Sequence, residues 1–208
     1  MMKTAGLGSV GRPTDRRRQT RDLVLDAALR LFSEHGYLGV RVADIAKQAG
    51  VSRATFYKHF AEREQILAEL FERLLGTESE AASPLHADLT GSQSVEQQIV
   101  GVVEAAVRRM LEQEQLARFV YSLPVRHSAL LRPGARTTPP VFAQVTRLLE
   151  AAAAHEEVRL DVSVALLARH VLEAMETAMR DWAEDRVDDP VGHVRLMLGL
   201  AFQGVTKR

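Results

Sequence analysis

The sequence predicts an all-α fold, and three observations favour it. Apolar residues recur with a helical period almost everywhere from residue 20 onward, and no segment alternates apolar and polar residues as a strand does. With 46% hydrophobic and 26% charged residues, the composition is that of a globular protein. A length of 208 residues is enough for one or two modest domains, each with a buried core.

Residues 1–19 are rich in Gly, Arg and Thr and contain few large apolar side chains, which predicts a flexible basic arm. Within this arm, residues 6–11 read GLGSVG and match the G-x-G-x-x-G spelling of a dinucleotide-binding loop. That loop requires a strand before it and a helix after it, and neither is predicted here. We therefore favour a flexible segment over a nucleotide site.

Two helices are expected between residues 20 and 50. The first begins near Thr20 and ends at Gly36, and the second is short and ends at Gly50, because a residue without Cβ suits a left-handed helix cap. Residues at helical spacing give each helix one apolar face: Val24, Ala27, Ala28, Leu31 and Phe32 in the first, and Val42, Ile45, Ala46 and Ala49 in the second.

Two further helices are expected between residues 52 and 75. Ser52 is a favoured N-cap for the third helix, in which Phe56 and Phe60 face inward. Its outward residues are Ala54, Thr55, Tyr57 and Lys58. A fourth helix runs from about Glu62 to Leu75 and buries Ile66, Leu67, Leu70, Phe71 and Leu74.

The remainder of the chain is also helical in pattern. After a connection at residues 76–93, a capping box over residues 94–97 begins a helix that extends to about Gln115, and a shorter helix through Phe119 stops before Pro124. Residues 132–140 are expected to form a loop. Three more helices are predicted over about 140–155, 161–187 and 190–205.

The two C-terminal helices, 161–187 and 190–205, carry apolar residues on more than one face. A helix with two apolar faces needs two partners. Either a second copy of the chain covers the outer faces, which would form a four-helix interface, or both faces are buried within one chain.

Charge is distributed unevenly along the chain. The total is balanced at 27 Lys and Arg against 27 Asp and Glu, yet residues 1–60 hold eleven of the former and five of the latter. The first third is therefore basic and the remainder acidic. This asymmetry is expected when one end of a protein meets a polyanion and the other does not.

Several classes of protein are excluded by what the sequence lacks. The absence of Cys excludes disulfides, thiolate zinc sites, iron–sulfur clusters and Cys nucleophiles. No catalytic motif or diagnostic spacing of carboxylates and histidines is present, so we expect neither an enzyme nor a cofactor. The apolar runs are too short to cross a bilayer, which favours a cytoplasmic protein. A DNA-packaging protein would be basic throughout.

Two short helices joined by three residues that include Gly have the layout of a helix-turn-helix, whose second helix enters the DNA major groove. Residues 20–75 resemble the DNA-binding domain of the TetR family of bacterial transcriptional regulators. Four short elements occur in the family's order and spacing: Gly36-Tyr37, Asp44-Ile45-Ala46, Ala49-Gly50-Val51-Ser52, and Phe56-Tyr57 followed by His59-Phe60.

The resemblance implies a DNA-contacting set in and around the third helix. Arg53 and Thr55 are the expected base readers, and Ala54 is placed to touch a thymine methyl group. Tyr57 and Lys58 are expected on phosphates. The full set comprises Arg41, Ser52, Arg53, Ala54, Thr55, Tyr57, Lys58, His59 and Arg63.

Arg41 and Arg63 stand where the second and fourth helices begin, so their charge and the helix N-terminus both attract a phosphate. The chain departs from the family pattern nearby. Val40 and Arg41 replace the usual hydroxyl residues, and Glu62 stands where Ser is frequent, so both helices lose a side-chain cap. The arginines at positions 12, 16, 17 and 18 either reach an adjacent minor groove or form a solvated tail.

The resemblance further implies a homodimeric regulator on a palindromic DNA operator, most simply a repressor that a small-molecule effector releases. A ligand-independent or activating regulator is the alternative. We expect an arm at 1–19, a DNA-binding domain at 20–75 and an effector-binding and dimerisation domain at 76–208.

The candidate ligand-lining residues combine adaptable Met and aromatic side chains with a polar group, and each also suits an ordinary core. They are Met110, Phe119, Tyr121, Phe142, His170 and Met175. His170, Glu173 and Glu176 share a helix at a spacing that can hold a metal, but such a series is more often a solvated or salt-bridged face, so no metal is expected.

Overall fold

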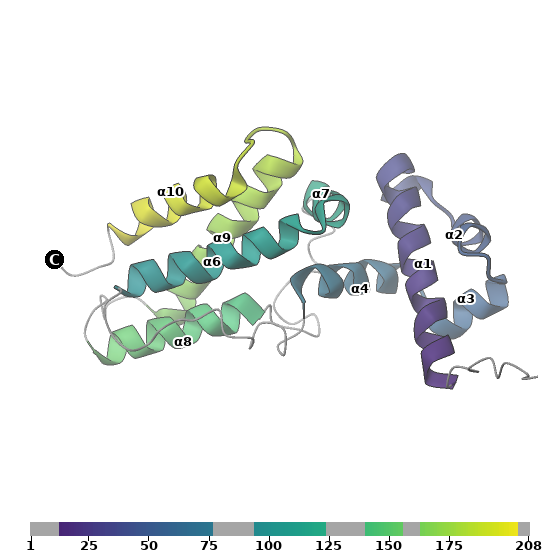
Figure 1. The fold of residues 1–208 in the computed structure, drawn as a ribbon, viewed down its shortest axis with the longest axis horizontal. Coiled ribbons are helices and arrows are strands. Elements are labelled where there is room, and N and C mark those ends of the chain that lie inside the picture. The colour runs from purple at the N-terminus through teal and green to yellow at the C-terminus, as the bar shows by residue number, and fades with distance from the viewer. Residues whose placement is uncertain (1–12, 77–93, 124–139, 156–162, 204–208) are drawn as a thin grey trace, which may run out of the picture. The chain divides into compact units, whose positions relative to one another are not determined.

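The computed structural model describes residues 13–76, 94–123, 140–155 and 163–203, which form helices and no strand (Figure 1). The all-α prediction is confirmed. The chain divides into two compact units, Met1–Ile66 and Leu67–Arg208. Among the helices that the structure describes, none has the length and apolar character needed to cross a membrane.

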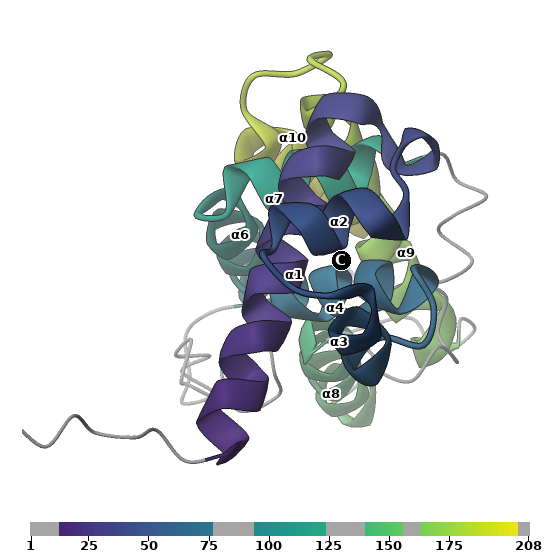
Figure 2. The same ribbon diagram turned by 90° about the vertical axis from the view of Figure 1, so that its right-hand side faces the viewer.

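The N-terminal unit contains α1 (Pro13–His35), the short 3-10 helix η1 (Tyr37–Gly39), α2 (Val42–Gln48) and α3 (Arg53–His59). α1 packs against η1 and α2, and α2 packs against α3 (Figure 2). α4 (Glu64–Leu75) begins at the end of this unit and continues into the next. Side chains with no exposed surface form the core: Val24, Ala27, Ala28, Ile45, Phe56, Phe60 and Ile66.

α1 begins at Pro13, so the prediction of a flexible arm is wrong for residues 13–19. Proline suits the first position of a helix because it has no N–H to leave unpaired. Arg and Gln are good helix formers, and a helix nucleated by its buried face extends readily through them. The Thr20 hydroxyl also donates to the Arg16 carbonyl at 2.9 Å. The GLGSVG segment and Arg12 lie outside the described residues.

The glycines predicted to end the first two helices do so. Gly36 and Gly50 have φ angles of 72° and 69°, in the left-handed region that other residues rarely adopt. After Gly50, the Val51 N–H donates to the Ala46 carbonyl at 2.9 Å and closes the end of α2. The turn between α2 and α3 is thereby fixed by backbone hydrogen bonds.

The C-terminal unit contains α6 (Val95–Leu111), α7 (Glu114–Ser122), α8 (Pro140–Ala154), α9 (Val164–Ala183) and α10 (Pro190–Phe202). α9 packs against α7, α8 and α10, while α6 packs against α8 and α10 (Figure 1). The largest fully buried side chains of this unit are Leu70, Leu74, Ile99, Met110, Leu149, Met179 and Leu198.

Several predicted boundaries are confirmed and others shift. The capping box at Ser94 is present, since the Gln97 N–H donates to the Ser94 hydroxyl at 3.3 Å and the Ser94 N–H donates to the Gln97 side chain at 3.1 Å. α6 ends at Leu111 instead of Gln115, and both C-terminal helices are shorter than predicted. Phe71 is only half-buried. The expected connections at 77–93 and 132–139 lie outside the described residues.

Two arginines tie the helices of the C-terminal unit together. Arg195 of α10 donates to the buried carboxylate of Glu104 on α6, which Arg108 also contacts at 3.1 Å. Arg118 of α7 lies 4.3 Å from the centre of the Trp182 ring and donates to Asp185 at 2.9 Å. α10 is thereby tied to α6, and α7 to the end of α9.

The apolar residues predicted on more than one face of the C-terminal helices differ in burial between α9 and α10. In α9 the apolar side chains from Val171 to Trp182 are buried within one chain. α10 buries Leu198 and Phe202, but Leu196 and Leu200 on its opposite face are 61% and 62% exposed.

Candidate DNA-binding surface and ligand pocket

The third helix is capped and anchored at its N-terminus. The Ser52 hydroxyl accepts the Thr55 N–H at 3.0 Å, as the sequence predicts for an N-cap. Replacing such a cap costs about 1 kcal/mol. Phe56 and Phe60 are fully buried with ring centres 5.8 Å apart, so the inner face of α3 is held by two aromatic rings.

The outer face of α3 carries the residues expected to contact DNA. Arg53, Ala54, Tyr57 and Lys58 are all exposed. In a helix these positions fall on one side, opposite Phe56. Tyr57 is 49% exposed while its ring packs edge-on against Phe56 at 5.5 Å, so a side chain at the surface is also held by the core.

The hydroxyl groups of Ser52 and Thr55 share a hydrogen bond of 2.9 Å. Each hydroxyl has one hydrogen to donate and two acceptor positions. If Ser52 donates to Thr55, the Thr55 hydrogen is left for an outside acceptor such as thymine O4 or a phosphate. The cap therefore orients a predicted base reader, although Thr55 is half-buried and less accessible than Arg53.

His59 occupies the edge of the predicted surface. It is half-buried, and its Nδ1 atom is buried with no hydrogen-bond partner among the described residues. Burial lowers the pKa of His59 below its ordinary value, and the nearby charges of Arg17 and Arg21 lower it further. A neutral imidazole at this position contributes less to phosphate attraction than Lys58 does.

Arg41 and Arg63 are placed differently from each other. Arg41 is exposed just before α2, and its backbone N–H donates to the Asp44 carboxylate at 3.2 Å. Arg63 is half-buried, donates to the carbonyls of Tyr37 and Val40 at 3.2 and 2.8 Å, and lies 4.2 Å from the centre of the Tyr37 ring. These contacts favour a role for Arg63 in holding the N-terminal unit together rather than in binding phosphate.

The chain compensates for the capping residues that it lacks relative to the family pattern. The Asp44 carboxylate accepts the backbone N–H of Arg41, the residue just before α2. Before α4, the Ala61 N–H donates to the Gln65 side chain at 2.9 Å. Asp44 and Gln65 each lie inside the helix that they cap. A search of the sequence for hydroxyl residues just before a helix therefore does not detect them.

Arg16, Arg17 and Arg18 are exposed on the first turns of α1. They belong to a helix and not to an extended arm, and Arg17 lies close enough to His59 to affect its pKa. The basic surface of the N-terminal unit thus includes the start of α1 as well as α3.

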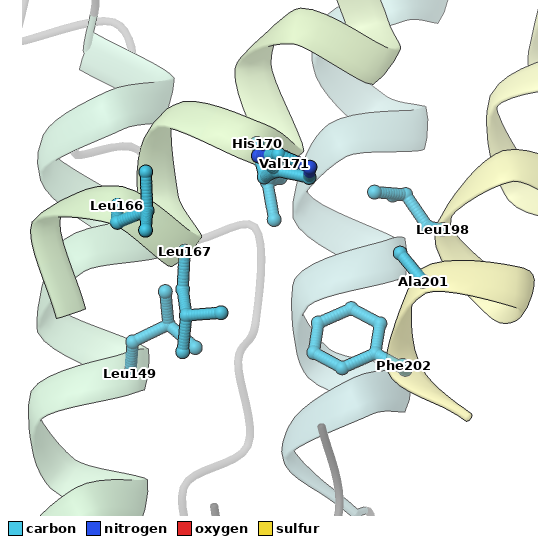
Figure 3. A pocket seen from close by; sticks show the side chains of 8 residues that line it. All are labelled: Leu149, Leu166, Leu167, His170, Val171, Leu198, Ala201 and Phe202. Carbon is cyan, nitrogen blue, oxygen red and sulfur yellow. The ribbon is translucent and has the colours of Figure 1, made fainter. Parts of the chain in front are cut away.

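A pocket of about 310 Å³ lies between α8, α9 and α10 (Figure 3). Leu149 and Leu167 stand on one side, α10 supplies the other side, and His170 and Val171 lie between them. All lining side chains except His170 are hydrocarbon: Leu149, Leu166, Leu167, Val171, Leu198, Ala201 and Phe202.

Of the six predicted ligand-lining residues, His170 alone lines this pocket. Met110, Phe119, Tyr121 and Met175 are buried core residues, and Phe142 is half-buried on α8. The Tyr121 hydroxyl donates to the Met110 sulfur at 3.3 Å, and burial raises the pKa of Tyr121. The predicted Met and aromatic residues mostly fill the core, whereas the pocket is lined mainly by aliphatic residues with no distinctive sequence signal, together with His170 and Phe202.

His170, Glu173 and Glu176 do not gather into a metal site. Within the ranges that the structure describes, no group of three or more His, Asp or Glu side chains is placed to hold a metal ion. Glu173 instead pairs with Arg169 at 3.6 Å along the exposed face of α9.

The capped helix α3, which follows α2 after a short turn that contains Gly50, has the layout of a helix-turn-helix with an exposed basic face. Residues 24–70 match the family model described as "Bacterial regulatory proteins, tetR family". The predicted resemblance to the TetR family is confirmed for this segment, and the curated proteins to which it is similar are named as transcriptional regulators.

The curated relatives that the chain matches are named as transcriptional regulators. The chain is 43% identical to the HTH-type transcriptional regulator AcrR of Shigella flexneri over 54 residues, 26% of this chain and 25% of AcrR. It is 30% identical to the regulator YttP of Bacillus subtilis over 117 residues, 54% of each chain. The match thus spans a quarter to about half of these relatives.

The fold is also similar to that of the transcriptional regulator FadR from Bacillus subtilis, solved in complex with stearoyl-CoA. The TM-score is 0.66 at 22% identity, and the similarity covers 86% of this chain and 96% of FadR. The likeness in fold therefore extends beyond residues 24–70, which the family model matches.

Proposed function

We propose that this protein is a cytoplasmic homodimeric repressor that binds a palindromic DNA operator. Binding of an apolar effector releases it from that operator. The observation that carries the proposal is the outer face of α3, where Arg53, Ala54, Tyr57 and Lys58 are exposed on a helix fixed by its cap and two buried rings. We assign DNA binding to residues 20–75, and effector binding and dimerisation to residues 76–208.

The roles within the DNA-binding face follow from side-chain chemistry. The Arg53 guanidinium can form two parallel hydrogen bonds with guanine, and Thr55 and Ala54 suit thymine. Tyr57 and Lys58 bind phosphates and set the register on the duplex. Arg41 binds phosphate at the start of α2, where the helix N-terminus adds to its charge.

Dimerisation is proposed through α9 and α10. The exposed leucines of α10, Leu196 and Leu200, are four residues apart and therefore neighbours on one face. Large apolar patches on a protein surface commonly mark interfaces. Two linked DNA-binding domains bind two half-sites one helical turn apart far more tightly than either alone.

The pocket between α8, α9 and α10 is the proposed effector site. Its hydrocarbon lining suits a long acyl chain, and His170 offers a single hydrogen-bonding group. The FadR structure, which has the same fold, contains stearoyl-CoA. An effector that binds the DNA-free conformation more tightly lowers operator affinity by that same ratio.

Selection of bound duplexes from a random pool, with the purified full chain at a stated salt near physiological, tests the DNA-binding proposal. We expect a palindromic consensus with two half-sites. Enrichment of no sequence, also after unfolding and refolding to remove any bound effector, would contradict the proposal.

Stearoyl-CoA added to the complex with the selected duplex tests the effector proposal. We expect release of the wild-type protein, and no release of an Ala201→Trp variant in which the new ring fills the pocket. Ala151→Trp, at an exposed position of α8 outside the lining, serves as the control and should respond as wild type. Equal release of all three would place the effector elsewhere.

A further inference from the structure

Arg21 of α1 contacts the C-terminal end of α3. Its Nη1 atom donates to the His59 carbonyl oxygen at 2.7 Å, across 38 residues of sequence. The last carbonyl groups of any helix have no partner within that helix and carry partial negative charge. A guanidinium at this position satisfies one of them and also complements the helix dipole.

The same guanidinium lies over an aromatic ring at the end of α3. The central carbon of Arg21 is 4.5 Å from the centre of the Phe60 ring, and Phe60 is fully buried. A planar cation stacked on a buried ring is restricted in orientation as well as in position. Arg21 is itself half-buried, so this contact is partly shielded from water and salt.

α3 is thus held at both ends by side chains that are not expected to read bases. Ser52 caps its first turn, and Arg21 closes its last. Between these two points, Phe56 anchors the middle of the helix against the core. The Arg21 contact connects the end of α3 directly to α1.

We propose that Arg21 is a positioning residue for sequence recognition, which fixes the tilt of α3 by joining the His59 carbonyl and the Phe60 ring to α1. The inference rests on the proposed DNA-binding function. It assigns to Arg21 an effect on specificity without any contact between Arg21 and DNA.

A small change in tilt is sufficient to disturb recognition. A helix of seven residues is about 10 Å long, so a tilt of about 10° about its capped end moves the other end by nearly 2 Å. Hydrogen bonds weaken steeply over such a displacement. Base contacts require several bonds at once, whereas attraction between Lys58 and a phosphate changes little over the same distance.

Arg21→Lys separates this role from a direct phosphate contact. The substitution keeps the positive charge but loses the planar group that reaches the carbonyl and the ring together. Arg30→Lys, on an exposed position of the same helix, is the matched control. Each variant is compared with wild type by its dissociation constants for the duplex selected by wild type and for a scrambled duplex, at several salt concentrations.

For Arg21→Lys we expect about tenfold weaker binding to the selected duplex, the size expected for loss of one charged hydrogen bond, with an unchanged salt slope. Binding to the scrambled duplex should change by less than about twofold, and Arg30→Lys should behave as wild type. Wild-type binding by Arg21→Lys, or equal losses on both duplexes, would overturn the inference. Failure of wild type to select any duplex would instead overturn the proposed function.

Hydrogen exchange of the free protein provides a second measurement that does not depend on DNA. Arg21→Lys should accelerate exchange of the Phe60 amide, which is bonded to the Phe56 carbonyl, and leave amides of α2 such as Ile45 unchanged. Uniform acceleration across the N-terminal unit would show general destabilisation and overturn the specific role.

Discussion

Lys58 and Arg53 share the exposed face of α3 but are proposed to bind different parts of DNA. For Lys58→Ala we expect weaker binding to every duplex, and a salt slope smaller by about one, because one phosphate contact is lost. Titrations over a range of salt measure both quantities. Arg30→Ala is the control for removal of a charge from the same unit. A loss confined to the selected duplex would mean that Lys58 reads a base.

His59 gives the N-terminal unit a predicted dependence on pH. Its pKa in the folded protein lies below the ordinary value of 6.5, because burial and the charges of Arg17 and Arg21 disfavour the imidazolium. The unfolded chain therefore binds more protons, and the free energy of unfolding is largest above pH 6.5 and falls as the pH drops below it. In His59→Asn the free energy of unfolding, measured by chemical denaturation at pH 5 and pH 7.5, should fall less between the two pH values than in the wild type. An identical fall in the variant would exclude His59 as its source.

The helices of the N-terminal unit are predictable because their signals are local. Gly36 and Gly50 end helices through backbone geometry, Ser52 caps a helix through its own side chain, and Phe56 and Phe60 follow helical spacing. Each feature depends on residues a few positions apart. The helical start of α1 at Pro13 was missed because exposed residues carry no apolar period, although their helix propensity is high.

The parts of the site that depend on long-range contacts were not predictable. The internal contacts of Arg63 and the contact between Arg21 and His59 join residues more than 20 positions apart. Apart from His170, the pocket is lined by hydrocarbon side chains such as those of Leu149 and Leu198, and the same residue types also fill an ordinary core. The space arises from how α8, α9 and α10 pack together, which the sequence pattern of each helix does not reveal.

Glu104 links α6 to α10 and makes that packing sensitive to acid. Its bonds to Arg195 and the charge of Arg108 lower its pKa below the ordinary 4.5, against the opposing effect of burial. The folded protein therefore binds fewer protons than the unfolded chain, and this stabilisation is present above pH 4.5 and lost as the pH falls through the lowered pKa. Glu104→Gln should lower the free energy of unfolding by about 1–2 kcal/mol at neutral pH. The difference should shrink at low pH, and a constant difference would contradict this role.

The whole molecule is proposed to act as a dimer through the outer face of α10. Leu196→Glu together with Leu200→Glu places like charges on the proposed interface, and we expect monomers in analytical ultracentrifugation. Operator affinity should fall by at least about 100-fold through loss of the second half-site, with little change on scrambled DNA. Ala151→Glu on α8 controls for added charge. A dimer that survives both substitutions would place the interface elsewhere.

The most direct test of the central claim, that the exposed face of α3 reads DNA sequence, is to repeat the selection from a random pool with Arg53→Ala. The wild-type protein should select a palindrome. The variant should select the same palindrome without a preference at one base position in each half-site, because one bidentate contact is lost. An unchanged consensus for the variant would contradict the proposed role of Arg53. Absence of a consensus from both proteins would contradict sequence recognition by α3 altogether.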